Sequence, residues 1–455
     1  MVAELHDHAA IQALLTQALE LVPSGQAEAL YTAHDLSLTR FANSRIHQNV
    51  SDRDASLRIR LVEDDRTGVA STNRLDGQGL REVIGRASAI RQAAAANPEQ
   101  ATLPAHDGEV DGMLGFVPAT DRADPELRAD GARAVIAGGE AAGLEVSGAF
   151  STQTSTVAVR NSNGVSGSHT TSQAKLVTVM MGGEGASGYA QATGTDVRAI
   201  DAAAVGEEAV DKAERGAGAG DLEPGEYEVI LEEYAVATLL EYLSFDGFSA
   251  LALQEGRSFM ELGQQVMGDN VTIWDDGHDA SGLPSAIDFE GVAKQRVELV
   301  TDGMATGVVH DTATARRAGT SSTGHALPSP NAWGPIAWNL FMAPGSSSKE
   351  AMLANTERGI WVTRFHYVNI VHPKKGILTG MTKDGTFLIE HGRIVRPLRN
   401  FRFTQSIPDA FSDIEAISSQ TRLVAAEYSG VNARVPALRI GRFNFTGATA
   451  REEAE

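Results

Sequence analysis

The stretch Glu226–Phe248 constrains the fold of this chain most, because it changes from strand to helix periodicity near the middle of the sequence. Tyr227, Val229 and Leu231 alternate with Glu226 and Glu228, which is the period of two expected of a half-buried strand. Beyond them, apolar residues recur at the spacing of one helix face, at Ala235, Leu239, Tyr242 and Leu243. The sequence therefore predicts a strand that leads directly into a helix, which the Asp246-Gly247 pair ends.

The length of 455 residues favours two domains over one core. No apolar run reaches membrane length, so no membrane span or membrane partner is expected. The formal charge of −21 disfavours binding to nucleic acid, because that affinity depends largely on cationic side chains. The absence of cysteine excludes disulfides and thiolate metal sites. The acidic beginning of the chain lacks the pattern of an export signal, so a cytoplasmic location is expected.

The first half of the chain predicts an α+β fold with an antiparallel sheet. Asn43-Ser44 and Glu63–Asp65 suit tight hairpin turns. Helices are expected at 1–22, 79–96, 124–142 and 201–215, and strands at 29–41, 45–52, 55–62, 68–71, 145–165 and 175–181.

The alternating run of glycine and alanine at 216–220 predicts a flexible joint. We therefore divide the chain into an N-terminal α+β domain, 1–220, and a strand-rich C-terminal domain, 221–455. The strands expected in the second domain are 293–309, 359–370, 376–378, 386–389 and 393–397, with Gly392 in the last hairpin turn.

Residues 183–188 match the G-x-G-x-x-G pattern of a dinucleotide site. Such a site needs a helix that begins at the loop, so that its amide groups face the phosphates. The residues that follow are rich in glycine and threonine and show no helical period. A glycine-rich hairpin is the better interpretation.

Glu241 and Asp246 are the carboxylates of the central helix that could be imagined as metal ligands. Side chains five positions apart point roughly 140° away from each other on a straight helix, and no histidine lies on this helix to join them. We expect a solvent-exposed Glu241 and a helix-ending Asp246.

Two later segments are candidates for contacts. The loop Gly319–His325 brings Ser322 close to His325 in sequence, but a nucleophilic serine also needs a base that a third group orients. We expect a structural turn that lines a central cavity. The aromatic stretch Asn331–Pro344 contains Trp333 and Trp338, and it suits a contact surface as well as a buried core.

Several of these motifs resemble the TldD/PmbA (TldD/TldE) family, whose members form a heterodimeric zinc protease. In TldD-type chains a strand runs into a helix that carries His-Glu-x-x-x-His. Aligning 229–231 with that strand puts Glu241, Tyr242 and Asp246 in the slots of the three motif residues. Further resemblance lies in residues 40–72, which look like the family's opening sheet, and in Thr323-Gly324 ahead of an apolar stretch and Pro344-Gly345.

The resemblance implies that this chain is the TldE/PmbA-like subunit, without zinc of its own. It would pair with a TldD-type chain that holds zinc, and the pair would degrade or process unfolded peptides. Where TldD-like chains carry glycines, this chain has Phe365-His366-Tyr367, so its peptide groove should differ. Contacts to peptide or partner are expected at Thr323, Gly324, His325, Trp333 and Trp338.

Two alternatives stay open at this point. One is a divergent hydrolase that acts alone and uses Glu241, Asp246 or His325. The other is a homodimeric binding or scaffold protein without enzymatic activity and without a zinc-bearing partner.

Overall fold

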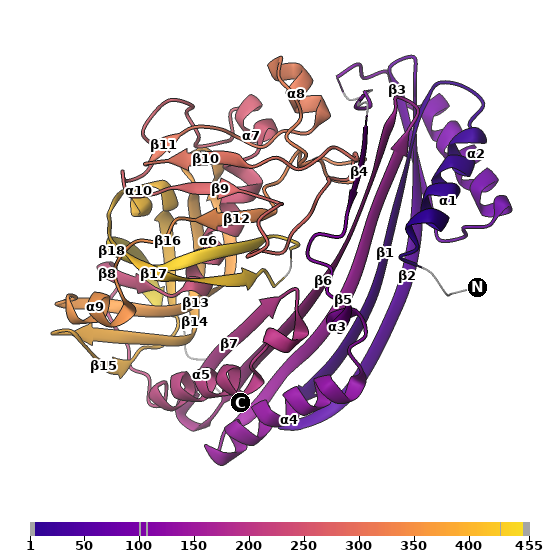
Figure 1. Ribbon diagram of the computed structural model, residues 1–455. Helices are drawn as coiled ribbons and strands as arrows, with labels where there is room; N and C mark the ends of the chain where they lie inside the picture. Colours follow the sequence, from indigo (N-terminus) through magenta and orange to yellow (C-terminus); the bar gives the residue numbers. More distant parts are fainter. Residues whose placement is uncertain (1–4, 100–101, 106–107, 428, 449–455) are drawn as a thin grey trace.

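Two large β-sheets face each other in the computed structural model, which describes residues 5–99, 102–105, 108–427 and 429–448 (Figure 1). The first sheet has seven strands in the order β3-β2-β1-β5-β6-β4, with β7 also paired to β6. All its pairings are antiparallel except that of β4 with β6. The strands are β1 (Gln26–Ala42), β2 (Arg45–Glu63), β3 (Arg66–Thr72), β4 (Gly108–Gly112), β5 (Glu145–Asn161), β6 (Val165–Met181) and β7 (Ser187–Gly194).

Two-residue turns connect the first three strands, as the sequence predicted. Asn43 and Ser44 both have positive φ, and so do Asp64 and Asp65, which is the backbone that a type I′ hairpin requires. The expected break near residue 53 is wrong, because β2 continues through its polar middle while it pairs with β1 along its whole length. The expected strand 145–165 is likewise divided at the turn before β6. The segment 183–188 lies in the β6–β7 hairpin, as expected, and contains the short helix η1 (Gly183–Gly185).

Helices cover one face of this sheet and leave the other face toward the second half of the chain (Figure 1). Residues of α1 and α2 pack on one end of the sheet, and residues of α4 and α5 pack on the other end. Each of these helices begins after an aspartate whose carboxylate accepts a hydrogen bond from a backbone N–H of the first turn. The helices are α1 (His8–Glu20), α2 (Gly77–Ala93), α4 (Pro125–Ala141) and α5 (Ala202–Arg215), with the shorter α3 (Pro118–Asp121) and η2 (Val197–Ala199) between them.

The second sheet has eleven strands in the order β11-β10-β9-β12-β18-β16-β14-β13-β8, with β15 paired to β14 and β17 paired to β18. Strand β8 also pairs with β18, so it has β13 on one side and β18 on the other. The strands are β8 (Gly225–Leu231), β9 (Ile273–Asp275), β10 (Val297–Thr301), β11 (Met304–Ala305), β12 (Asn339–Met342), β13 (Arg358–His372), β14 (Ile377–Glu390), β15 (Arg393–Pro397), β16 (Phe401–Ser406), β17 (Ile414–Ala425) and β18 (Asn432–Ala448).

Several strand boundaries in this half differ from the expectation. Residues 293–309 form two short strands, because Asp302 and Gly303 have positive φ and turn the chain. The segments 376–378 and 386–389 are parts of one strand, β14. Strand β15 and the turn at Gly392 are confirmed. The short helices of this half are α7 (Ala250–Gln254), α8 (Thr312–Ala318), α9 (Lys349–Ala354), α10 (Ile407–Ser412) and η3 (Pro373–Lys375).

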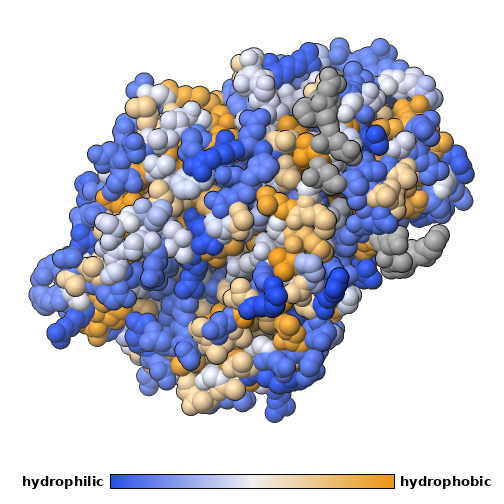
Figure 2. Space-filling model, viewed as in Figure 1, coloured by the Kyte–Doolittle hydropathy of each residue, from blue (hydrophilic) through white to orange (hydrophobic). Residues whose placement is uncertain are grey.

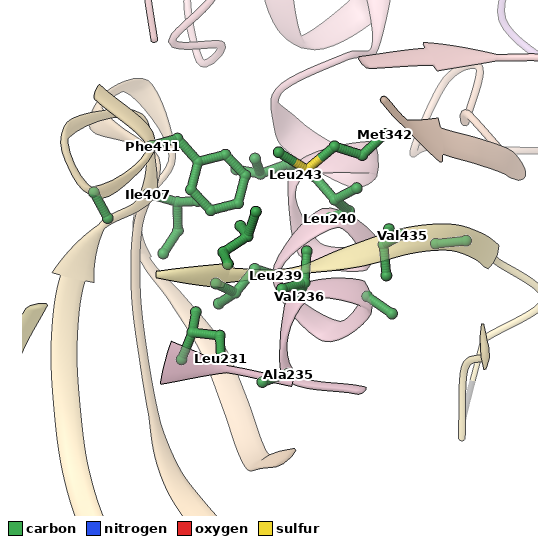
Figure 3. Close-up of a cluster of buried hydrophobic side chains, with 14 of the residues drawn as sticks. Leu231, Ala235, Val236, Leu239, Leu240, Leu243, Met342, Ile407, Phe411 and Val435 are labelled. Carbon is green, nitrogen blue, oxygen red and sulfur yellow. The ribbon is translucent and has the colours of Figure 1, made fainter. Parts of the chain in front are cut away.

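The predicted strand–helix stretch forms β8 and α6 (Glu233–Asp246), and α6 lies inside the main hydrophobic core (Figure 3). Helix α6 is buried on more sides than the single apolar face that the sequence predicted. Val236 and Leu240 are completely buried beside Leu239 and Leu243, and Phe411 of α10 packs in the same cluster. A helix that is apolar on most sides is typical of such a buried position.

Buried ion pairs and hydrogen bonds join the two halves. Lys212 of α5 contacts Glu232 at 2.7 Å, and Arg60 of β2 contacts Glu290 at 3.0 Å. The glycine-rich segment 216–220 is not a free linker, because Gly218 donates to the Glu184 carbonyl and Gly220 is hydrogen-bonded to Pro397. The division of the chain at residue 220 stays a prediction. In the described part of the chain, no helix combines the length and apolarity needed to cross a membrane.

Truncating a side chain on α6 should test whether this helix anchors the fold. Leu240 is 0% exposed, and Leu240→Ala should lower the free energy of unfolding by about 2–5 kcal/mol because it leaves a cavity. Leu262 is 50% exposed, so the matched Leu262→Ala should cost less than about 0.5 kcal/mol. Denaturant unfolding of both variants measures the difference, and equal losses would contradict the central role of α6.

Candidate functional site

The polar side of α6 lines a pocket between the two sheets. Thr238, Glu241 and Tyr242 of α6 contribute to its wall. The remaining wall comes from β7, from residues 364–368 of β13 and from the connection between β17 and β18. The family-motif positions 241 and 242 therefore face a pocket whose other residues come from distant parts of the chain.

Glu241 is half-buried in this pocket, which corrects the expectation of a solvent-exposed side chain. Burial raises the pKa of the Glu241 carboxyl, while its hydrogen bond to Ser429 and the nearby Lys175 lower it in part. Lys175 reaches from β6 and donates to the carbonyls of Ala425 and Ala426 at 3.2 Å and 3.0 Å. Burial also lowers the pKa of this lysine. The Glu241 carboxyl is therefore surrounded by polar groups of this chain, Ser429 and Lys175.

Asp246 ends α6, as predicted, and its carboxylate pairs with Arg257. It is not part of the pocket that contains Glu241. Among the residues that the structure describes, no group of three or more histidine, aspartate or glutamate side chains is arranged to hold a metal ion. The residues in the motif slots thus do not fit a zinc site, since zinc in a catalytic site takes three converging protein ligands.

The segment 365–367 shapes the opposite wall of the pocket. The guanidinium of Arg364 lies 4.2 Å from the centre of the Tyr189 ring and donates to Asp384 at 2.7 Å. Phe365 is buried and packs against Phe403. Tyr367 has positive φ and is largely exposed. The bulky side chains that replace glycines therefore split between the core, the pocket wall and the surface.

His325 lies in a second, fully buried polar cluster. Its Nδ1 is 2.9 Å from the hydroxyl of Thr323, and its Nε2 is 2.8 Å from Asp275 Oδ1. Burial lowers the pKa of His325. Burial would raise the pKa of Asp275, but Lys294 and His325 lower it to about 2. With 0% of its side chain exposed, His325 supports the loop from within rather than facing a cleft.

The neighbouring loop residues explain why this turn has its shape. The Ser322 hydroxyl donates to the carbonyl of His310 at 3.2 Å, while both ring nitrogens of His325 are engaged by Thr323 and Asp275. Gly324 has positive φ, and a Cβ there would lie 2.4 Å from the carbonyl oxygen of Ala293. The predicted structural turn therefore needs glycine at this position.

The two tryptophans of the aromatic stretch have different environments. Trp333 is 60% exposed, and its ring lies 6.0 Å from that of Phe245. Trp338 is half-buried, and its carbonyl accepts hydrogen bonds from Asn432. Contact of these residues with peptide or partner stays a prediction, as it does for Thr323, Gly324 and His325.

Sequence reasoning did not find the polar residues around Glu241: Gln191 and Arg364 line its pocket, and Lys175 and Ser429 interact with its carboxyl. They come from four separate segments, and no local motif connects them. A lysine at an inward position of a strand is one signal that could have indicated Lys175.

Comparison with known proteins identifies the family to which this chain belongs. Models of the three PmbA/TldA metallopeptidase domains match successive parts of the chain. The PmbA/TldA metallopeptidase domain 1 matches residues 27–91, the central domain matches 120–217 and the C-terminal domain matches 224–447. The chain belongs to the PmbA/TldD family.

Individual relatives agree with this membership. The metalloprotease TldD homolog of Haemophilus influenzae is 29% identical over 168 residues, which are 36% of this chain and 34% of that protein. Metalloprotease PmbA of Escherichia coli is 29% identical over 161 residues, 35% of this chain and 33% of that protein. This chain thus spans about a third of the length of these curated relatives. The crystal structure of TldE from Thermococcus kodakarensis has the same fold, with a TM-score of 0.86 at 19% identity, over 96% of this chain and 100% of that one.

The stability of the folded chain should report the environment of Glu241. Because burial raises its pKa above the ordinary value of 4.5, the native state holds a proton there that the unfolded state releases. The contribution of Glu241 to stability therefore falls as the pH rises from about 4.5 through the folded pKa. Glu241→Gln cannot ionise, so its free energy of unfolding should rise relative to the wild type across this window.

Urea unfolding at a series of pH values measures this difference. Glu140→Gln, at an exposed position of α4, is the control and should show no comparable trend. A Glu241→Gln difference that stays constant with pH would contradict the buried environment of this glutamate.

Proposed function

We propose that this chain is the TldE/PmbA-like subunit of a heterodimeric metalloprotease that degrades or processes unfolded peptides. Its partner is a TldD-type chain that supplies the zinc and the catalytic glutamate. This chain completes the assembly and shapes the access of peptides to the partner's site. The assembly works in the cytoplasm.

One observation carries the proposal: the two carboxylates of α6, Glu241 and Asp246, do not converge on one point that could hold a metal ion. Glu241 is engaged with Ser429, and Asp246 is paired with Arg257 on another side of the helix. A site that had lost a single ligand would leave the other ligands aimed at one point. Here the two carboxylates belong to different surroundings, which supports a chain whose contribution is structural.

The match of all three family domains also supports this role. A chain that has lost its metal residues and still retains the complete fold is expected to keep a structural task, such as closing a shared chamber. The likeness to the Thermococcus kodakarensis TldE structure supports the same assignment at the level of the fold.

Mixing this chain with a TldD-type chain from the same organism should give a specific complex. The interface should bury more than about 1,200 Å² in total, as stable interfaces do. Size-exclusion chromatography with light scattering should show one species that contains both chains. Two separate species at micromolar concentrations would contradict the heterodimer, and a stable dimer of this chain alone would favour a homodimeric scaffold.

The isolated chain should bind less than stoichiometric zinc and cleave no unfolded peptide. Glu241→Gln and Asp246→Asn should leave the peptidase activity of the mixed complex within about twofold of the wild type, because neither side chain serves as a ligand. Metal analysis and a casein-cleavage assay measure both. One tightly held zinc per chain, with activity lost in Glu241→Gln, would instead identify a hydrolase that acts alone.

A further inference from the structure

Two cavities between the sheets join at β13. Arg364 and His366 line both the pocket that contains Glu241 and a larger cavity of about 870 Å³. The larger cavity lies between the β6–β7 hairpin of the first sheet and residues 383–386 of β14. Its volume is within the range of small-molecule sites. We call the joined space the His366 cleft, because a single ligand that passes His366 can extend into both parts.

Strand pairing places three basic side chains on one face of the second sheet. Arg364 of β13 lies directly opposite Lys383 of β14, and His366 lies opposite Met381. Side chains that are opposite each other, or two positions apart on one strand, project from the same face of a sheet. Thr382, on the other face, is completely buried. The Arg364, His366 and Lys383 side chains therefore project together toward the cleft that they line.

Lys383 is the member of this group whose charge lacks a counter-ion. The Arg364 guanidinium donates to Asp384 at 2.7 Å and lies 3.4 Å from Glu427, so its charge is compensated. The Lys383 amino group has neither an ion pair nor a hydrogen bond with the described residues, and the residue is partly exposed. Like charges directly opposite each other destabilise a strand pair. An anion beside Lys383 would remove this cost, and the amino group is accessible to it.

His366 is a second group that an anion can reach. Its ring is partly exposed, and no hydrogen bond joins its nitrogens to the residues that the structure describes. Burial lowers the pKa of the His366 ring, and the neighbouring Arg364 and Lys383 lower it further. Glu427 and Asp384 oppose this effect only in part. The ring is therefore neutral at pH 7, where one of its nitrogens carries an N–H that can donate to an anion.

The surroundings favour a carboxylate with an aliphatic neighbour. Asp384 and Glu427 already flank the basic face, so phosphate would meet more repulsion than a singly charged carboxylate does. The smaller part of the cleft has a volume of about 90 Å³ and an aliphatic wall that includes Ala237, Val368 and Val424. An apolar cavity of about 150 Å³ holds benzene, so this one admits a group of about four carbons. A carboxylate beside a leucine-sized side chain is the C-terminal end of a peptide.

We propose that the His366 cleft binds the C-terminal residue of a peptide. The terminal carboxylate accepts hydrogen bonds from Lys383 and from the His366 ring. The aliphatic side chain contacts Val368 and Val424, and the preceding residues leave through the larger cavity. The choice of a peptide rests on the function proposed above, whereas the site consists of residues of this chain alone. In the proposed assembly, this chain holds the end of a peptide that its partner cleaves.

Four probes test the chemistry of the ligand: N-acetyl-leucine, N-acetyl-leucinamide, N-acetyl-glycine and inorganic phosphate. Ligand-observed NMR titration of the full wild-type chain at pH 7 should show saturable binding of N-acetyl-leucine. The amide lacks the charge and should bind about tenfold more weakly, and the glycine derivative lacks the side chain and should bind about fivefold more weakly. Equal affinity for the amide, or no saturable binding, would overturn the proposal. Tighter binding of phosphate would overturn the assignment to peptides.

The pKa of His366 reports where the carboxylate binds. A carboxylate next to the ring stabilises its charged form, so saturation with N-acetyl-leucine should raise the pKa of His366 by about 1. A pH titration of the histidine NMR signals measures this change, and the His366→Asn variant identifies the signal. N-acetyl-leucinamide is the matched control and should leave the pKa unchanged. An unchanged pKa with saturating N-acetyl-leucine would overturn the position of the carboxylate.

Variants of Lys383 test its role. Lys383→Gln should weaken the binding of N-acetyl-leucine about tenfold without lowering the thermal midpoint, because the amino group has no partner to lose in the described structure. Lys383→Arg keeps the charge and should retain most of the affinity. Lys374→Gln, at an exposed position of η3 in the same hairpin, is the control and should not change it. Unchanged affinity in Lys383→Gln would overturn the role of this lysine.

One further probe separates the two sources of a carboxylate in a peptide. The 1-amide of N-acetyl-glutamic acid carries its carboxylate on a side chain and has no terminal charge. It should bind at least fivefold more weakly than N-acetyl-leucine, and equal affinity would overturn the choice of the C-terminus. All of these measurements use this chain alone, so their outcome is independent of whether the heterodimer forms.

Discussion

The ion pair between Lys212 and Glu232 holds the two sheets together at the beginning of α6. Both side chains are buried, and the other oxygen of Glu232 accepts from the Trp361 indole at 2.6 Å. Breaking such a pair by removing one partner typically costs about 3–5 kcal/mol, because a charge stays buried without compensation. A similar contact between Arg60 and Glu290 joins the halves near another part of the first sheet. The pocket that contains Glu241 is lined by residues of both sheets, so its walls depend on how the sheets are held together.

Family membership identifies the fold of this chain, whereas the side chains of α6 determine which chemistry that fold can support. The three matching domains assign the fold and the class. The side chains on α6 decide what this chain can do with that fold. Glu241 shares a pocket with Arg364 and interacts with Lys175, while Asp246 is paired with Arg257. The helix positions that the sequence resemblance singled out thus lie in separate surroundings, Glu241 in a polar pocket and Asp246 in an ion pair.

The elements predicted best from the sequence are those whose local pattern agrees with their surroundings. The hairpin turn at Asn43-Ser44 has turn chemistry that acts within a few residues, and the β8–α6 stretch has a clear change of period. The polar middle of β2 was misjudged, because pairing with a long neighbour supplies hydrogen bonds that propensity does not show. Strands β16 to β18 were not predicted at all, although they supply much of the main core.

The candidate site was predictable only where one segment provides it. Positions 241, 242 and 246 follow from the helix and its resemblance, whereas the polar partners of Glu241, Lys175 and Ser429, are far away in sequence.

The position of β8 has a consequence for the order in which the chain can fold. This strand pairs with β13 and with β18, whose partner residues follow it by more than a hundred positions. Such a high contact order slows folding, because long loops must close, at a cost in chain entropy, before these strands can form hydrogen bonds. During synthesis, the first sheet can form while the second half is still on the ribosome. The apolar surface of α6 then stays uncovered until the last strand emerges, which makes this half the part most dependent on chaperones.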